Sequence, residues 1–288
     1  MKSTLKVWTG LGVATALVGA GLAGCAGENG EGGESGADTA QTGEAGEGEG
    51  GEGEGGEGEG GEGEAGAGDG EGGIAVADAA SDPVVFGSAL AIVEAHAIAA
   101  RDAYAIGKTN AAAEMFAHPV AEVLADIDPV FEQLGVADLK PAMISASQAA
   151  LEPDNSATVE EAYETIIAAL KEASTKAPKS DLSNGAVAAG IVSDQIDRAI
   201  SMYQRAGTSE EYGPYLDGYG FYRTAANAFE RDAGTIKTYN SGLHSDIKAA
   251  LDLLGTAYPD AARPETLEIA QGKLLAASSK VKLGLPAS

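Results

Sequence analysis

A run of 48 residues, 26–73, confines any fold to the part of the chain that follows it. The run contains 22 glycines and 15 acidic residues but no lysine or arginine, and its unit Glu-Gly-Glu-Gly-Gly repeats from Glu47, Glu52 and Glu57. Such a segment has too little apolar surface to offset the entropy lost on ordering, so we expect it to be disordered. As a flexible coil it would span about 38 Å.

The residues before this run have the layout of an export signal. Lys2 and Lys6 precede an apolar stretch over residues 7–23, which ends in small residues and is followed by Cys25. The stretch is nearly long enough for a membrane helix, but it is rich in glycine and alanine and a cleavage context follows it. We therefore expect residues 1–24 to be a signal peptide that is removed.

Residues 22–25 read Leu-Ala-Gly-Cys and resemble the lipobox of bacterial lipoproteins. The resemblance implies cleavage before Cys25 and acyl chains on that cysteine, and stable anchoring requires more than one chain. Residues 25–81 would then be the lipidated cysteine and its linker. Ala26 follows the cysteine where an aspartate would favour the inner membrane, so the resemblance implies the outer membrane in a cell that has two. An unmodified, free cysteine is the alternative.

Cys25 is the only cysteine in the chain. The domain that follows the linker therefore has no disulfide, although an exported protein could form one. Thiol redox chemistry, Cys-His catalysis and thiolate zinc sites are excluded for the same reason.

The charge balance excludes one class of partner. The chain carries a net charge of −26, and the part after residue 73 holds 16 basic against 29 acidic residues. Phosphate backbones would repel so acidic a domain, so we expect no binding to nucleic acid. The expected partners are the membrane, through the lipid anchor, and other proteins of the cell envelope.

Residues 82–288 have the pattern of one all-helical domain. Apolar residues recur at helical spacing, as at Val159, Ile166 and Leu170, and strand-like alternation is absent. Prolines at expected first turns and glycines after periodic stretches mark starts and stops. The pattern predicts an up-and-down bundle, as one bundle or as two abutting bundles, with helices near 83–106, 110–126, 129–134, 139–151, 159–176, 185–206, 214–233, 239–254 and 264–283.

A first candidate site surrounds His118. Glu114, His118, Glu122 and Asp126 follow one another at spacings of four and would share a helix face. Three carboxylates and an imidazole could hold a divalent metal ion. Pro119 is expected to break or restart the helix, and a solvated acidic face carrying one histidine is the alternative.

His96 is a second candidate metal ligand. Ile92, Ala99 and Ala103 lie on the same side of its helix, so the imidazole should point inward. A buried neutral histidine bonded to a neighbouring helix is the alternative. The chain has no Gly-x-Ser-x-Gly and no His-Glu-x-x-His motif, so we assign no catalytic residues and expect a binding role.

A cluster of tyrosines forms a third candidate. Tyr215, Tyr219 and Tyr222 would share one helix face, and Arg223 adds a positive charge beside them. Such a face could bind haem, ferric iron or a sugar ring. A tyrosine layer inside the bundle is the alternative. Because Pro119 interrupts the His118 face, we expect the tyrosines to contribute more to a ligand site.

An exported helical protein with this N-terminus resembles the imelysin-like and iron-uptake lipoproteins of bacterial envelopes. The resemblance implies paired helical bundles and a role with iron or haem. That family's Gly-x-His-x-x-Glu signature does not occur: Glu94 and Ala99 stand where His96 would need the glycine and the glutamate, and Glu122 follows His118 one residue too late. We therefore expect an envelope lipoprotein that binds iron, haem or a divalent metal; the alternative is a non-catalytic interaction or spacer module.

Overall fold

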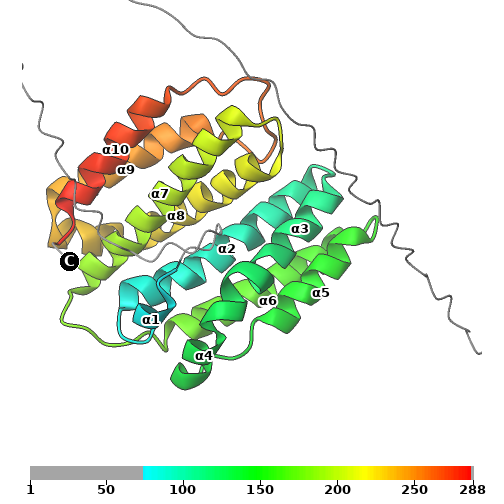
Figure 1. Cartoon of the computed structure of the whole chain (residues 1–288), viewed down its shortest axis with the longest axis horizontal. Coiled ribbons are helices and arrows are strands. Elements are labelled where there is room, and N and C mark those ends of the chain that lie inside the picture. Colours follow the sequence, from blue (N-terminus) through cyan, green and yellow to red (C-terminus); the bar gives the residue numbers. More distant parts are fainter. Residues whose placement is uncertain (1–73, 287–288) are drawn as a thin grey trace, which may run out of the picture. The chain divides into compact units, whose positions relative to one another are not determined.

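The computed structural model describes residues 74–286, which form helices and loops with no strand in that range. The prediction of an all-α fold is confirmed. The signal peptide, Cys25 and residues 26–73 lie outside the described residues. In chain order the helices of Figure 1 are α1 (Val76–Ala79), α2 (Pro83–Ala105), α3 (Thr109–Pro119), the π-helical turn η1 (Val120–Leu124), α4 (Ala125–Leu134), α5 (Lys140–Leu151), α6 (Ser156–Ser174), α7 (Asn184–Thr208), α8 (Gly213–Tyr239), α9 (Ser241–Ala257) and α10 (Gln271–Gly284).

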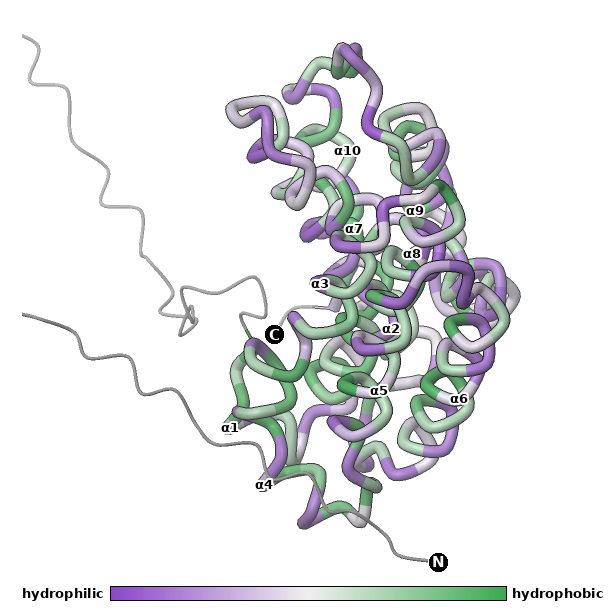
Figure 2. The backbone as a smooth tube through the Cα atoms, turned by 90° about the vertical axis from the view of Figure 1, so that its right-hand side faces the viewer, coloured by the Kyte–Doolittle hydropathy of each residue, from purple (hydrophilic) through white to green (hydrophobic). Residues whose placement is uncertain are grey.

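The helices pack as two abutting bundles. In the first bundle α2 contacts α3 and α6, while α5 contacts both of these neighbours. In the second bundle α7 contacts α8 and α10, and α9 lies against all three. The two bundles meet where α2 packs on α7 and α8, so α2 lies between the other helices in both ribbon views (Figures 1 and 2).

Helix α2 is long and apolar enough to cross a membrane by length and composition. In the fold, however, 78% of its most apolar 18-residue window is buried. Its buried side chains include Phe86, Ile92 and Ile98, which belong to the hydrophobic core. Burial against neighbouring helices therefore accounts for the apolar character of α2.

Glycines allow α2 to approach the second bundle closely. A β-carbon at Gly220 of α8 would lie only 2.4 Å from the carbonyl oxygen of Ala95 on α2. A β-carbon at Gly87 of α2 would lie 2.3 Å from the side chain of Ile191 on α7. The Ile191 side chain could move aside, but the backbone at Ala95 could not, so at Gly220 the close approach of α8 to α2 requires glycine.

Several predicted helix ends are confirmed. The side chain of Asp82 accepts a hydrogen bond of 2.7 Å from the amide of Val84 and caps α2. Gly107 and Gly135 follow α2 and α4 with φ of +80° and +71°, the left-handed conformation that glycine adopts at low cost. Pro214 lies in the first turn of α8.

The break expected at His118 and Pro119 was wrong. The helix continues from α3 through η1 into α4, and the π-helical turn begins directly after Pro119. A proline removes one backbone hydrogen bond from a helix, and the wider π turn accommodates that loss without ending the helix. Buried Val123 and Leu124 in η1 fix the turn to the core.

Two helix boundaries that the sequence predicted for the second bundle were also wrong. Helix α8 does not stop at Gly234 but continues to Tyr239. A glycine inside a helix costs about 1 kcal/mol, which packing readily offsets. Pro264 does not start a helix, because residues 258–270 form an irregular segment and α10 begins at Gln271. Side-chain hydrogen bonds between that segment and the second bundle replace the helical ones.

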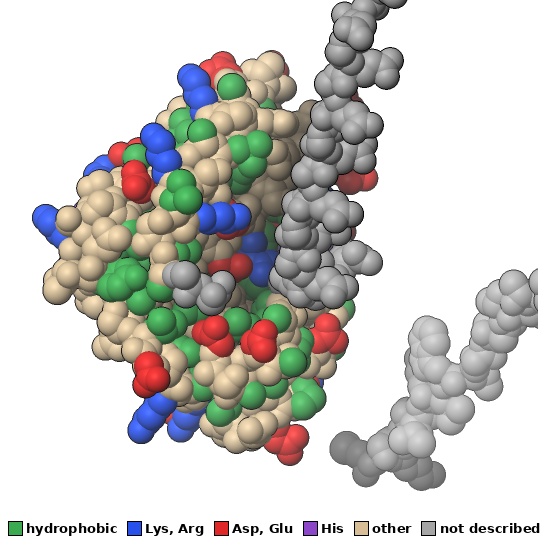
Figure 3. Space-filling view, turned by 60° about the vertical axis from the view of Figure 1, so that its left-hand side comes forward, with side chains coloured by type: hydrophobic (Ala, Val, Ile, Leu, Met, Phe, Trp, Pro, Cys, Tyr) green, Lys and Arg blue, Asp and Glu red, His purple; other side chains and the backbone are tan. Residues whose placement is uncertain are grey.

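The surface carries charges of both signs. On the face shown in Figure 3, lysine and arginine side chains are interspersed with aspartate and glutamate, and hydrophobic side chains lie between them. This face therefore carries basic as well as acidic side chains, although the net charge of the domain is negative.

Candidate metal centre

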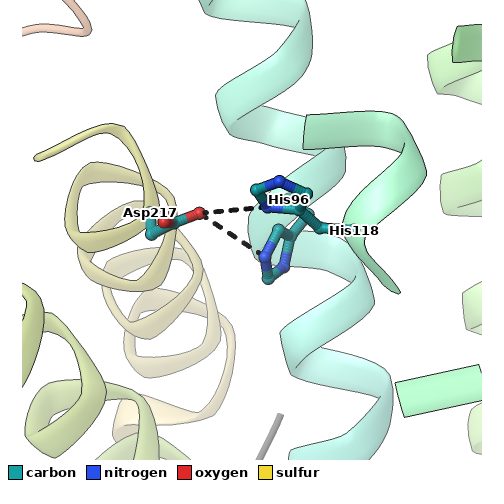
Figure 4. Close-up of side chains that lie close together, drawn as sticks. All are labelled: His96, His118 and Asp217. Atoms are coloured by element: carbon teal, nitrogen blue, oxygen red, sulfur yellow. Dashed lines mark ion pairs between the residues drawn. The ribbon is translucent and has the colours of Figure 1, made fainter. Parts of the chain in front are cut away.

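His96, His118 and Asp217 converge where the two bundles meet. We call them the histidine–aspartate cluster. They come from α2, α3 and α8, and one ligand atom from each lies within 4.8 Å of the other two (Figure 4). His96 is 1% exposed and Asp217 is 3% exposed, whereas the side chain of His118 is 33% exposed. Three metal-ligating groups from three helices therefore meet at a buried site, and only part of the His118 side chain reaches the surface.

The backbone fixes which nitrogen of His96 faces the cluster. Its Nδ1 lies 2.9 Å from the carbonyl oxygen of Ile92, which can only accept a hydrogen bond, so Nδ1 carries a proton. Nε2 is then the nitrogen that faces Asp217, at 3.5 Å from its Oδ1. A histidine that donates one N–H to a backbone carbonyl and offers the other nitrogen is the usual arrangement of a metal ligand.

The distances within the cluster are long for direct hydrogen bonds. Nδ1 of His118 lies 4.0 Å from Oδ1 of Asp217, and Nε2 of His96 lies 3.5 Å from the same oxygen. Nitrogen–oxygen hydrogen bonds usually span about 2.7–3.2 Å. With metal–ligand bonds of about 2.0–2.2 Å, two ligands of a tetrahedral zinc ion are roughly 3.3–3.5 Å apart. Because the three ligand atoms lie within 4.8 Å of one another, sharing one ion would draw some pairs together by up to about 1.4 Å.

Aromatic contacts hold the two imidazoles in place. The ring of Phe221 meets that of His96 edge to face, with centroids 5.7 Å apart and planes at 89°. The rings of His96 and His118 are 5.8 Å apart at 71°. The buried walls lower the local dielectric and strengthen the attraction between a bound cation and the Asp217 carboxylate.

Local structure explains how the three residues meet. Gly220 touches the backbone of Ala95, the neighbour of His96, and Asp217 lies one turn before Gly220 on α8. The close approach of α8 to α2 therefore carries the carboxylate to the imidazole. His118 directly precedes Pro119 and η1, and π-helical turns often occur at functional sites.

Two of the four predicted metal ligands lie in the cluster, and two do not. His96 and His118 converge, whereas Glu114 and Glu122 are not among the converging residues. Glu114 is exposed beside a hollow at the start of α3, and Glu122 lies in η1.

The sequence reasoning missed Asp217. It lies about a hundred residues after His118, and no local spacing pairs it with a histidine on another helix. The one available signal was its position inside an apolar stretch, between Leu216 and Gly218, where a carboxylate needs a partner.

The predicted tyrosine residues lie elsewhere and make contacts within the protein. Tyr215 donates to the carbonyl oxygen of Asp260 at 2.9 Å, and Tyr219 donates to Oδ2 of Asp102 at 2.7 Å. Arg223 donates to the Tyr219 oxygen at 2.5 Å and pairs with Asp102 at 3.4 Å. The ring of Tyr222 stacks on that of Tyr258, which is buried.

Similar contacts attach the irregular segment 258–270 to the second bundle. Tyr258 donates to the carbonyl oxygen of Ala199, and Arg263 donates to that of Ala206.

Burial raises the pKa of Tyr219 to about 12 and that of Tyr215 further above its ordinary value. Raised pKa values disfavour the phenolate that would ligate ferric iron at neutral pH.

No protein-family model matches the chain, and no curated protein and no solved structure is significantly similar to it. The resemblance to imelysin-like lipoproteins stays a prediction. The geometry of the histidine–aspartate cluster is therefore the feature that indicates a function.

Proposed function

We propose that the helical domain binds one divalent transition-metal ion between its two bundles. The ligands are Nε2 of His96, Nδ1 of His118 and the carboxylate of Asp217. The observation that carries the proposal is the convergence of these three atoms to within 4.8 Å from three different helices. Binding sites often form where structural units meet, because a side chain from each unit can reach the same point.

The ligand set selects the class of metal. Imidazole nitrogens suit zinc and iron(II), whereas calcium and magnesium prefer sites built from oxygen ligands. Three protein ligands leave at least one coordination position for water or another small ligand. His118 is the one ligand of the three whose side chain is partly exposed, so it is the ligand nearest to the surface. This arrangement supports reversible binding of zinc or iron(II).

The sequence supports a place for this site in the cell envelope. The proposal extends to a protein anchored through acyl chains on Cys25, with the linker 26–73 holding the metal-binding domain away from the lipid. Replacing Cys25 with serine should then move the protein from the detergent phase to the aqueous phase in a phase-partitioning experiment. Unchanged partitioning would contradict the anchor and leave the metal site untouched.

Titration calorimetry tests the metal site. The full chain carrying Cys25→Ser is stripped of metal and titrated with zinc, and we expect one ion per chain. Each of the changes His96→Ala, His118→Ala and Asp217→Asn should weaken zinc binding at least tenfold.

His244→Ala is the matched control, because His244 is the third histidine of the chain and packs against Phe229, with ring centroids 5.0 Å apart. Its zinc affinity should equal that of the parent chain. Circular dichroism establishes that each variant is folded. If zinc does not bind to the folded parent chain, or binds equally to all variants, the metal-binding proposal fails and the interaction or spacer role replaces it.

A further inference from the structure

A groove lies along the boundary between the bundles, away from the histidine–aspartate cluster. Helices α2, α6, α7 and α8 line it, and its volume is about 490 Å³. This volume is within the range of pockets that hold small organic molecules. Its walls are largely apolar, with side chains that include Leu90, Ile167, Leu170, Ile191 and Ala228.

One residue that lines this groove has a buried hydroxyl group without a hydrogen bond among the described residues. Thr224 is 1% exposed, and its hydroxyl oxygen has no hydrogen-bond partner among the described residues. Leaving a buried hydroxyl unsatisfied is costly, so a ligand group that bonds to it would bind favourably. The same groove contains Glu94, where burial raises the pKa of the carboxyl group and nearby Arg231 partly opposes that shift.

Two cationic side chains also line the groove. Lys171 extends from the last turn of α6, and Arg231 extends from α8. Nε of Arg231 pairs with its neighbour Asp232 at 3.1 Å, and the arginine side chain is 62% exposed. A guanidinium has further N–H donors that remain available for an anion. The lining of the groove thus holds two cationic side chains and one carboxyl group, that of Glu94, in a domain whose net charge is negative.

The groove is separate from the histidine–aspartate cluster. Thr224 lies two helical turns after Asp217, which is about 10 Å along α8. Gly220 lies between them, where α8 touches the backbone of α2. This close contact divides the boundary between α2 and α8 into two parts.

We propose that this groove binds a small amphiphilic anion with an apolar body and one carboxylate. Lys171 and Arg231 attract the carboxylate. The apolar chain lies against the aliphatic walls, and the hydroxyl of Thr224 and the carboxyl group of Glu94 offer hydrogen bonds to a polar substituent of the ligand. The apolar walls supply affinity, and the two cations supply selectivity for negative charge.

Decanoate is a probe for this groove, with decyltrimethylammonium as a cation of the same chain length. The full chain carrying Cys25→Ser is titrated with each compound by calorimetry. We expect decanoate to bind at least tenfold more tightly than the cation. The double change Lys171→Gln and Arg231→Gln should weaken decanoate binding at least tenfold.

Two controls separate the groove from the rest of the chain. Lys176→Gln removes a cation that lies just beyond α6 and pairs with Glu172, so it should leave decanoate binding unchanged. Asp217→Asn should also leave it unchanged, since it alters only the metal centre. Equal binding of the two probes, no binding of decanoate, or full affinity in the Lys171 and Arg231 double variant would each overturn the proposal.

Discussion

Two polar regions share helix α8 and differ in the distances between their polar atoms. In the tyrosine region, Tyr215 and Tyr219 donate hydrogen bonds of 2.9 and 2.7 Å to oxygens of neighbouring segments. In the histidine–aspartate cluster, the nitrogen–oxygen distances to Asp217 are 3.5 and 4.0 Å. Short bonds show polar groups that hold the fold together. The convergence of three side chains at longer distances fits the proposal that they share a bound ion.

The comparison also separates the chemistry of the two regions. Burial raises the pKa values of Tyr215 and Tyr219 and so favours the neutral phenol, which can donate to a backbone carbonyl, as Tyr215 does, or to a carboxylate, as Tyr219 does. The cluster combines two imidazoles with a carboxylate, and that set suits a cation. Removing a tyrosine hydroxyl should thus affect stability, whereas removing a cluster ligand should affect metal binding.

The largest expected effect is stabilisation by metal. Zinc at about one hundred times its dissociation constant should raise the free energy of unfolding by about 2.7 kcal/mol. For a domain of this size that raises Tm by about 5–10 °C. Differential scanning calorimetry with and without zinc measures the shift, and in Asp217→Asn at the same zinc concentration it should fall to about half or less. An equal shift in parent and variant would place the zinc elsewhere.

Gly220→Ala should couple stability to metal binding. The added methyl group would lie 2.4 Å from the carbonyl oxygen of Ala95, so α8 must move away from α2. We expect a loss of about 2–3 kcal/mol in the free energy of unfolding, together with weaker zinc binding. Urea unfolding and zinc titration test both effects. Gly234→Ala is the matched control, because no atom lies within 4 Å of the added β-carbon. Unchanged zinc affinity in the folded Gly220→Ala protein would show that the close approach does not position Asp217.

Tyr219→Phe should affect stability alone. It removes the hydrogen bond to the Asp102 carboxylate, which the neighbouring arginines continue to pair. We expect a loss of about 1–2 kcal/mol in the free energy of unfolding, measured in urea, with zinc affinity within twofold of the parent chain. A large loss of zinc affinity without a loss of stability would instead favour the tyrosines as the ligand site.

The smallest effect concerns alkaline pH. Burial, and next the nearby Asp260, raise the pKa of Tyr212 to about 12 from an ordinary value of about 10. Between these values the folded protein holds a proton that the unfolded chain has lost. The stabilisation is therefore complete below about pH 10 and declines as the pH rises towards 12. Urea unfolding at several pH values should show a shallower decline in Tyr212→Phe, and identical slopes would argue against the shift.

The sequence was sufficient for the helical architecture because its signals are local. Asp82 before Pro83, and the glycines at 107 and 135, act within a few residues, and the structure confirms each of them. Pro119 predicted a helix break and Pro264 predicted a helix start, and both predictions were wrong because tertiary contacts outweighed these local preferences. Burial of η1 kept the helix through Pro119. Hydrogen bonds that two distant tyrosines donate to the carbonyl oxygens of Asp260 and Ala261 held the segment around Pro264 in an irregular form.

The candidate site could be predicted only in part. Helical spacing indicated that His96 points inward, and the structure confirms this burial. The same spacing grouped His118 with carboxylates on its own helix, because periodicity compares only residues of one element. The meeting of His96 with His118 and Asp217 depends on the packing of α2, α3 and α8, which no local pattern encodes.

The most direct test of the metal centre is the position of the metal itself. Crystals of the protein grown with zinc, with diffraction data collected on both sides of the zinc absorption edge, locate the ion by its anomalous signal. We expect one strong peak within about 2.0–2.2 Å of Nε2 of His96, Nδ1 of His118 and a carboxylate oxygen of Asp217. A peak bound to Glu114 and Glu122 instead, or no peak near the three residues, would contradict the proposed metal centre.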